Sequence, residues 1–149
     1  MDENFKLLLR VRYCECDAQQ VVFNARYGDY VDIAMTEFMR HLFGGYTAML
    51  EQGIDNQVVR LAIDWKASAR FDDVLAISVA TARIGNTSFT LQLHFVNYAT
   101  GAAVATAEIT YVLVSAENYT KIPVPDEMRE KLTHGAPNVV INHAGVALN

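Results

Sequence analysis

The sequence predicts an α+β domain in which a curved antiparallel sheet of about five strands wraps one long central helix. Three observations predict it. One long stretch, at about residues 25–43, repeats apolar side chains at helical spacing. Several other segments alternate apolar and polar residues with a period of two, which is typical of strands with one buried face. Short turns join most of these segments, and short turns favour antiparallel neighbours.

The first half of the chain is expected to contain one strand, one loop and the long helix. The strand is expected over residues 5–13, because every odd-numbered position there is apolar. Residues 14–26 have no clean period and are expected to form a loop. Asn24 is the expected N-cap of the helix, because its short side-chain oxygen can accept from the first free N–H groups. Gly44, together with the glycine after it, supplies a left-handed helix end.

The second half is expected to be a meander of four strands after a short helical turn at residues 46–52. In the first of these strands, the odd-numbered residues from Val59 to Ala69 are apolar and are expected to face the core. The later strands are expected over residues 74–84, 89–95 and 103–114. A sheet with one apolar face needs a cover, and the long helix is the only sizeable cover that the sequence offers.

The length of 149 residues favours a single domain. We expect this domain to span residues 1–133. Residues 134–149 are almost uncharged and show no clear period. This tail is expected either to be disordered or to add a short strand through Val139, Val140 and Ile141.

The charge of the chain argues against several classes of partner. The formal net charge is −5, and the 12 basic residues are scattered rather than clustered. Binding to nucleic acid needs a clustered positive surface, so no nucleic-acid partner is expected. The apolar stretches are too short to span a bilayer, which takes about 20 residues. The first residues are acidic, unlike a secretory signal, so the chain is expected to be a cytoplasmic protein.

No metal or other cofactor is expected. Cys14 and Cys16 are too close in the chain for an ordinary disulfide and are expected to be reduced. The four histidines make no zinc-type spacing with them. The sequence also contains no glycine-rich phosphate loop and no serine nucleophile elbow.

Two features of the predicted loop and helix start are candidates for chemistry. Asp17 follows the opening strand, and no positive charge lies in the neighbouring residues 18–23. A carboxylate held among apolar side chains is a functional candidate, whereas an ordinary loop aspartate bonds its own backbone; both readings stay open. The helix start at residues 24–27 has unpaired N–H groups that bind negative charge. A carboxylate beside such a group could act as a base or nucleophile on a carbonyl.

The sequence of this region resembles the active-site signature of the hotdog-fold acyl-CoA thioesterases. The resemblance is carried by Tyr13-x-x-x-Asp17-x-x-x-Val21-Val22-Phe23-Asn24-x-x-Tyr27. Further matches follow in order at residues 58–60, 69–73 and 85–89. The resemblance covers roughly residues 5–132 and is greatest to the 4-hydroxybenzoyl-CoA thioesterase group, including its relatives in the Tol–Pal gene cluster. Relatives usually have glycine before the Val-Val pair, where this chain has Gln19 and Gln20.

The resemblance implies a homodimer or homotetramer whose sheets join edge to edge, with active sites between subunits. It implies that Asp17 is the catalytic carboxylate and that the backbone N–H of Asn24 polarises the thioester carbonyl. The implied substrate-binding residues are Val22, Phe23, Tyr27 and Ser88, with Val58, Val59 and Arg60 contributed by the partner subunit.

The expected function is therefore hydrolysis of an acyl-CoA thioester. Asp17 would either activate water or attack the carbonyl, and the sequence leaves both open. Two alternatives remain at this point. A hotdog dehydratase would pair a histidine with a carboxylate, and the loop contains no histidine. A non-catalytic acyl-thioester-binding protein is the other alternative, because Gln19 and Gln20 change the loop.

Overall fold

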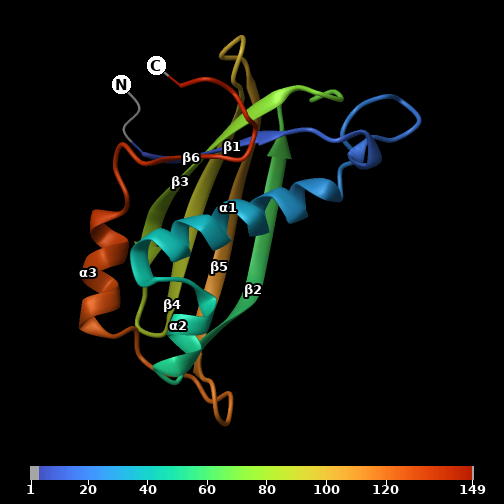
Figure 1. Ribbon diagram of the computed structural model, residues 1–149. Helices are drawn as coiled ribbons and strands as arrows, with labels where there is room; N and C mark the ends of the chain where they lie inside the picture. The colour runs from blue at the N-terminus through green and yellow to red at the C-terminus, as the bar shows by residue number, and fades with distance from the viewer. Residues whose placement is uncertain (1–3, 149) are drawn as a thin grey trace.

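The computed structural model describes residues 4–148, in which a six-stranded sheet packs against one long helix (Figure 1). The strands are β1 (Phe5–Arg10), β2 (Ile54–Trp65), β3 (Val74–Ile84), β4 (Ser88–Asn97), β5 (Ala103–Ser115) and β6 (Val140–Asn142). The helices are α1 (Arg26–Phe43), α2 (Tyr46–Glu51) and α3 (Asp126–His134), with a 3-10 turn at Tyr13–Glu15. The predicted α+β class, with a long helix lying across a curved sheet, is confirmed.

The sheet has one more strand than predicted. Its order is β2-β5-β4-β3-β1-β6, and every neighbouring pair is antiparallel except β1 and β6. The sixth strand comes from the tail, where residues 140–142 pair in parallel with residues 6–8. Of the two fates considered for the tail, this segment adopts the strand, and β6 lies beside β1 in Figure 1.

The core lies between α1 and the concave face of the sheet. The buried side chains of α1 recur at helical spacing, as predicted, and are Tyr27, Tyr30, Val31, Ala34, Met35, Phe38 and Met39. Each large apolar side chain that is fully buried contributes about 1.5–3 kcal/mol. The Tyr27 ring lies against the Trp65 ring, with centroids 5.7 Å apart, so the start of α1 is held beside the end of β2. No helix in the described part of the chain is both long and apolar enough to cross a membrane.

The opening strand ends at Arg10, earlier than its alternating pattern predicts. The chain turns there because Glu15 bonds back to Arg12. The Glu15 N–H donates to the Arg12 carbonyl at 3.0 Å, and the Arg12 N–H donates to the Glu15 carboxylate at 2.8 Å. Tyr13, predicted to lie in the strand, is 80% exposed on this turn. The turn changes the direction of the chain, and the loop that follows it carries Asp17 and leads to the start of α1.

The odd-numbered residues of β2 from Leu61 to Trp65 share the helix-facing side of the sheet, as expected, but this side is only partly buried along β2. Val59, Leu61 and Trp65 are 58%, 43% and 49% exposed. The physical reason is that β2 is an edge strand, with β5 on one side and no strand of residues 4–148 on the other. The register with β5 also shifts between Val58 and Arg60, so Val59 is an extra residue and the facing pattern reverses there.

Candidate active site at the start of the long helix

A cavity of about 470 Å³ lies where the loop, α1 and the end of β2 meet. We call it the Asp17 cavity. It is lined by three segments: Asp17, Gln19, Val21, Val22 and Asn24 from the loop, Tyr27 from α1, and Trp65, Lys66, Ala67 and Ser68 from the end of β2 and the residues after it. The structure therefore brings Asp17, Val22, Asn24 and Tyr27 together.

The backbone of the loop holds the Asp17 carboxylate in place. The Asp17 N–H donates to the Val21 carbonyl at 2.9 Å, and the Val22 N–H donates to the Ala69 carbonyl at 2.8 Å, which docks the loop on the residues before β3. The Asp17 Oδ1 accepts the Gln19 N–H at 2.8 Å, as the ordinary loop-aspartate reading expected. The side chain is half-buried, and its Oδ2 accepts no hydrogen bond within residues 4–148. One oxygen is thus used for orientation, and the other is left without a hydrogen-bond donor in the described part of the chain.

The loop requires a left-handed backbone at Gln20, whose φ is +67°. Left-handed backbone costs a residue with a Cβ about 1–2 kcal/mol relative to the right-handed region, and glycine avoids most of this cost. Gln20→Gly is therefore expected to raise the free energy of unfolding by about 0.5–1 kcal/mol. Urea unfolding checks it, with Gln19→Gly as the matched control because Gln19 has no positive φ. A stabilisation that is equal in both variants would contradict this explanation.

The buried side chain of Glu15 stabilises the loop through hydrogen bonds. Its side chain is only 4% exposed and accepts hydrogen bonds from the Arg12 backbone and guanidinium and from the Tyr30 hydroxyl, the last at 2.9 Å. Burial by itself would raise the pKa of Glu15, but the hydrogen bonds from Arg12 and Tyr30 outweigh it, and the net pKa is lowered. The Phe23 N–H also donates to the Glu15 carbonyl at 2.9 Å. Glu15 therefore ties together the turn, the loop and α1.

The lowered pKa predicts how stability depends on pH. Because the folded pKa lies below that of an unfolded glutamate, about 4.3, the stabilisation from Glu15 is complete above that value. It is lost as the pH falls through the folded pKa. Tyr30→Phe removes one charge-assisted hydrogen bond and is expected to cost about 1.5–3 kcal/mol at pH 7, with a smaller cost in acid. Unfolding measured across this pH range checks it, and a cost that does not change with pH would contradict the role of Glu15.

The predicted N-cap is wrong, since Ala25 holds that position and no side chain caps the helix. The first helical N–H groups bond to carbonyls instead. The Tyr27 N–H donates to the Asn24 carbonyl at 3.2 Å, and the Arg26 N–H donates to the Phe23 carbonyl at 2.9 Å. The N–H groups of Asn24 and Ala25 donate no hydrogen bond within residues 4–148. Of these two residues, Asn24 lines the Asp17 cavity, so a free amide lies near the positive end of the helix dipole at this cavity.

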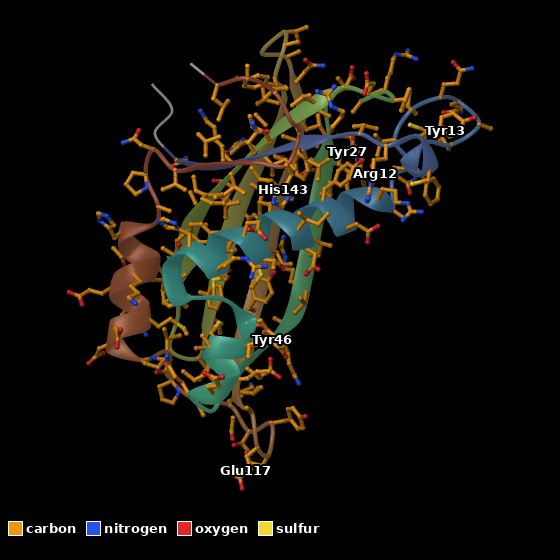
Figure 2. The ribbon with its side chains drawn as sticks, in the orientation of Figure 1. Arg12, Tyr13, Tyr27, Tyr46, Glu117 and His143 are labelled. Carbon is orange, nitrogen blue, oxygen red and sulfur yellow. The ribbon has the colours of Figure 1, made fainter. Side chains whose placement is uncertain are left out.

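Aromatic side chains form the floor of the cavity. The Tyr27 ring, labelled in Figure 2, makes edge contacts with Tyr30, Trp65 and Phe95 at centroid distances of 5.5–5.7 Å. Tyr27 is 2% exposed, and burial raises the pKa of its phenol. Phe23 is 46% exposed and is not among the residues that line the cavity, whereas Val22 of the same loop lines it and is buried. Tyr27 is thus a core residue that also lines the cavity.

The remaining predicted site residues lie elsewhere in the chain. Val58, Val59 and Arg60 are five to seven residues before Trp65, a separation of about 17–23 Å along β2. Ser88 lies at the same end of the sheet, because it pairs with Val112, which pairs with Gln57. A single chain therefore does not bring these four residues to Asp17.

Sequence reasoning missed Lys66 and Ser68. Both line the Asp17 cavity, although the loop itself has no cation between residues 18 and 23. No local pattern identifies them, because they reach the cavity only through the position of β2 against α1. No histidine lines the Asp17 cavity.

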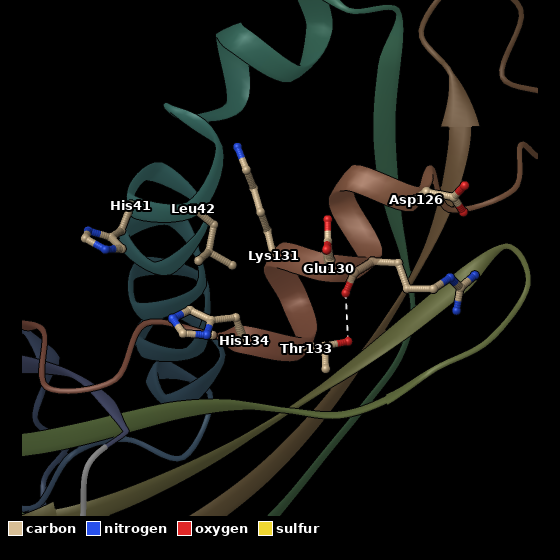
Figure 3. Close-up of a pocket in the computed structure, with 9 residues that line it drawn as sticks. His41, Leu42, Asp126, Glu130, Lys131, Thr133 and His134 are labelled. Carbon is tan, nitrogen blue, oxygen red and sulfur yellow. Dashed lines mark hydrogen bonds between the residues drawn. The ribbon is translucent and has the colours of Figure 1, made fainter.

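A second hollow, of about 1240 Å³, lies between the end of α1 and α3 (Figure 3). It contains His41 and His134 together with acidic side chains such as Glu130. Neither histidine has an ion pair or hydrogen bond with a carboxylate among residues 4–148. No group of three or more potential metal ligands occurs in the described residues. Both cysteines are free thiols, with Cys14 exposed.

Comparisons with known proteins identify the family. The family model described as the thioesterase-like superfamily matches residues 11–132. An acyl-CoA thioesterase YbgC from Haemophilus influenzae is 35% identical over 85 residues, covering 56% of this chain and 62% of that protein. An acyl-CoA thioester hydrolase YbgC from Escherichia coli is 30% identical over 110 residues, covering 74% of this chain and 81% of that protein.

A solved structure agrees with the sequence comparisons. The crystal structure of the probable thioesterase YbaW from Escherichia coli superposes with a TM-score of 0.78 at 25% identity, covering 88% of this chain and 98% of that one. The family match takes in the Asp17 loop, α1 and the four strands β2 to β5. The chain therefore belongs to the thioesterase-like superfamily and has the hotdog fold.

Proposed function

We propose that this protein hydrolyses an acyl-CoA thioester to a free acid and CoA at the Asp17 cavity. One observation carries the proposal: a half-buried carboxylate and the unpaired N–H of Asn24 at the start of α1 share one cavity. A base or nucleophile beside an oxyanion donor is what acyl transfer needs. The family membership supports the reaction class, and the two YbgC relatives carry acyl-CoA hydrolysis in their names.

The thioester carbonyl oxygen accepts a hydrogen bond from the Asn24 N–H, and negative charge develops on that oxygen as the carbonyl carbon is attacked. One such donor contributes about 10²–10³ in rate. Asp17 acts through the oxygen that its loop leaves free. As a base, it takes a proton from water while the water oxygen adds to the carbonyl. The carbon–sulfur bond then breaks, and the thiolate of CoA leaves and is protonated.

As a nucleophile, Asp17 instead adds its own oxygen to the carbonyl. The carbon–sulfur bond breaks and a mixed anhydride remains on Asp17. Water then cleaves this anhydride to release the acid and restore the carboxylate. Both routes consume one water and need the same two groups, so the geometry supports the reaction without choosing between them.

A second copy of the chain completes the site by pairing its β2 with this β2. The helix-facing residues of β2 are Val58, Leu61, Ile63 and Trp65, because Val58 pairs with Tyr111 and Leu61 with Ile109, both buried, and Val59 is the extra residue. If the β2 strands of two copies pair antiparallel with the two-fold axis at Ala62, the helix-facing residues of both copies lie on the same side of the joined sheet. This pairing sets Arg60 of one copy opposite Asp64 of the other, and Val58 of one copy opposite Trp65 of the other.

This pairing explains the placement of the distant site residues. Neighbouring strands lie about 5 Å apart, so Val58, Val59 and Arg60 of one copy border the Asp17 cavity of the other. Ser88 lies at the same end of the sheet as Val58, and we assign it to the CoA arm of the substrate. The turn before it is held by the Arg129 guanidinium, which donates to the Gly85 carbonyl at 2.9 Å.

The test is release of free thiol from a panel of acyl-CoA esters, with the mass of the protein measured alongside. We expect turnover of at least one ester and a dimer or tetramer in solution. Binding of CoA esters without thiol release would instead favour a non-catalytic acyl-thioester-binding protein. A dehydratase function is disfavoured because no histidine lines the Asp17 cavity. Conversion of hydroxyacyl esters to enoyl esters by the protein would instead support a dehydratase.

A further inference from the structure

A separate cavity of about 370 Å³ lies between α1, α2 and the sheet. We call it the methionine cavity. Its apolar lining is Met35, Met39, Met49 and Val58, and its polar lining is Asp32, Thr36, Tyr46, Asn56 and Tyr111. Ligand pockets usually measure 300–1,000 Å³, and methionine walls adapt readily to apolar groups of different shape. The volume and the lining therefore suit part of a small molecule.

Two residues that line this cavity carry buried donor atoms with no partner in the described part of the chain. The Asn56 Nδ2 and the Tyr111 Oη are fully buried atoms that make no hydrogen bond within residues 4–148. Tyr111 is 3% exposed and its ring stacks on Phe89 with centroids 5.2 Å apart, so the hydroxyl cannot swing out to solvent without losing this packing. An unpaired buried polar group costs about 1–3 kcal/mol, and such groups are rare in native proteins.

The chemistry of the two groups selects what they bind. The Asn56 Nδ2 can only donate. Burial, and then the nearby Asp32 carboxylate, raise the pKa of Tyr111, so its hydroxyl stays protonated and can also donate. Two donors in one apolar cavity fit an oxygen that accepts. Asp32 lines the same cavity and would repel an anion, so the fitting acceptor is neutral.

The pairing of β2 strands places this cavity next to the proposed catalytic centre. Val58 lines the methionine cavity, and Val58 of one copy lies opposite Trp65 of the other, which lines the Asp17 cavity. An acyl group whose carbonyl lies at Asp17 and Asn24 of one copy can therefore extend past Trp65 into the methionine cavity of the other copy. This step rests on the proposed function and on the proposed pairing.

We propose that the methionine cavity takes the distal part of the acyl group, and that this part carries a neutral oxygen, a hydroxyl or a carbonyl, which accepts hydrogen bonds from Asn56 and Tyr111. The substrate class is therefore an oxygenated acyl-CoA rather than a plain fatty acyl-CoA. An acyl group with a distal carboxylate is selected against by Asp32.

The experiment compares matched esters at two chain lengths: hexanoyl-CoA and decanoyl-CoA, each with its ω-hydroxy and ω-carboxy counterpart. We expect kcat/KM to be about tenfold higher for the ω-hydroxy ester than for the plain ester at one length or both, because a site with buried donors discriminates against a ligand that leaves them unpaired. The ω-carboxy ester should be the poorest of the three. These measurements need no variant, so they do not depend on how a substituted chain folds.

Two variants then test whether Asn56 and Tyr111 cause the preference for the ω-hydroxy ester. Tyr111→Phe and Asn56→Leu should each reduce the ratio of ω-hydroxy to plain kcat/KM by about threefold, since each removes one of the two donors that share the tenfold preference. Tyr98→Phe, an exposed tyrosine in the turn between β4 and β5, is the matched control and should leave the ratio and the activity unchanged. Thermal unfolding of each variant reports whether the fold survives.

The failures of the two proposals are distinguishable. If no ester releases thiol, the proposed function fails. If plain esters are hydrolysed through Asp17 but the ω-hydroxy ester has no advantage at either length, the inference about the methionine cavity is overturned alone. A ratio that Tyr111→Phe leaves unchanged also overturns it.

Discussion

Asn in place of Asp17 should lower the turnover of an acyl-CoA ester by about 10²–10⁴-fold, the range usual for losing a positioned base, and by more if Asp17 is the nucleophile. The side-chain amide oxygen can still accept the Gln19 N–H, so the loop should keep its conformation. What is lost is the carboxylate that takes a proton or attacks the carbonyl. Single-turnover and steady-state thiol release, with circular dichroism for the fold, measure the effect.

Asp126→Asn is the matched control for this change. Asp126 is exposed in the first turn of α3 and does not line the Asp17 cavity. Its substitution should leave turnover within twofold of the parent, since an exposed charge at a helix start affects stability by only about 0.3–1 kcal/mol. If Asp17→Asn retains the turnover of the parent, the proposed mechanism is wrong.

The second large effect is expected from Leu61→Lys, which should convert the assembly to a monomer. Leu61 is 43% exposed in the single chain, so the substitution costs little in the folded monomer. In the proposed pair it lies near the two-fold axis on the helix-facing side, and each assembly then buries two ammonium groups in an apolar contact. We expect at least a 100-fold loss of activity as well, because each Asp17 cavity loses the segment supplied by the other copy. Light scattering measures the mass, and thiol release measures the activity.

Val140→Lys tests which edge of the sheet makes the assembly. Val140 is similarly exposed, at 41%, but lies on β6 at the opposite edge. This variant should keep the mass and activity of the parent. A Leu61→Lys protein that remains a dimer with full activity would contradict the β2 pairing, and a monomeric Val140→Lys protein would place the interface on β6.

The sequence predicts the elements whose patterns are determined locally. The helix expected at residues 25–43 is observed at Arg26–Phe43, and the strand expected at 74–84 is observed at Val74–Ile84, because each has a period that its own packing satisfies. The end of β1 could not be predicted from alternation, since Tyr13 continues the apolar pattern while Glu15 bends the backbone through hydrogen bonds.

The candidate site was only partly predictable for a related reason. Asp17 and Asn24 are close in the sequence and can be assigned together. Lys66 and Ser68 reach the same cavity from more than 40 residues away, through the contact between β2 and α1. The exposure of Leu61 also escapes a single sequence, because periodicity tells which residues share a face and not whether this chain or another covers it.

The parallel pairing of β6 with β1 has a consequence for how many copies can associate. A sheet with a long, unpaired edge strand on both sides can pair with further chains at both edges and grow into an open-ended assembly. Here the edge strand next to β1 is β6, which has only three residues. Beside it, the Arg10 guanidinium donates to the Ala144 carbonyl at 3.0 Å. Of the two sheet edges in residues 4–148, the β2 edge is the longer one and carries exposed apolar side chains. In the proposed β2 pairing, two copies cover this edge of each other, and the joined sheet would end at twelve strands.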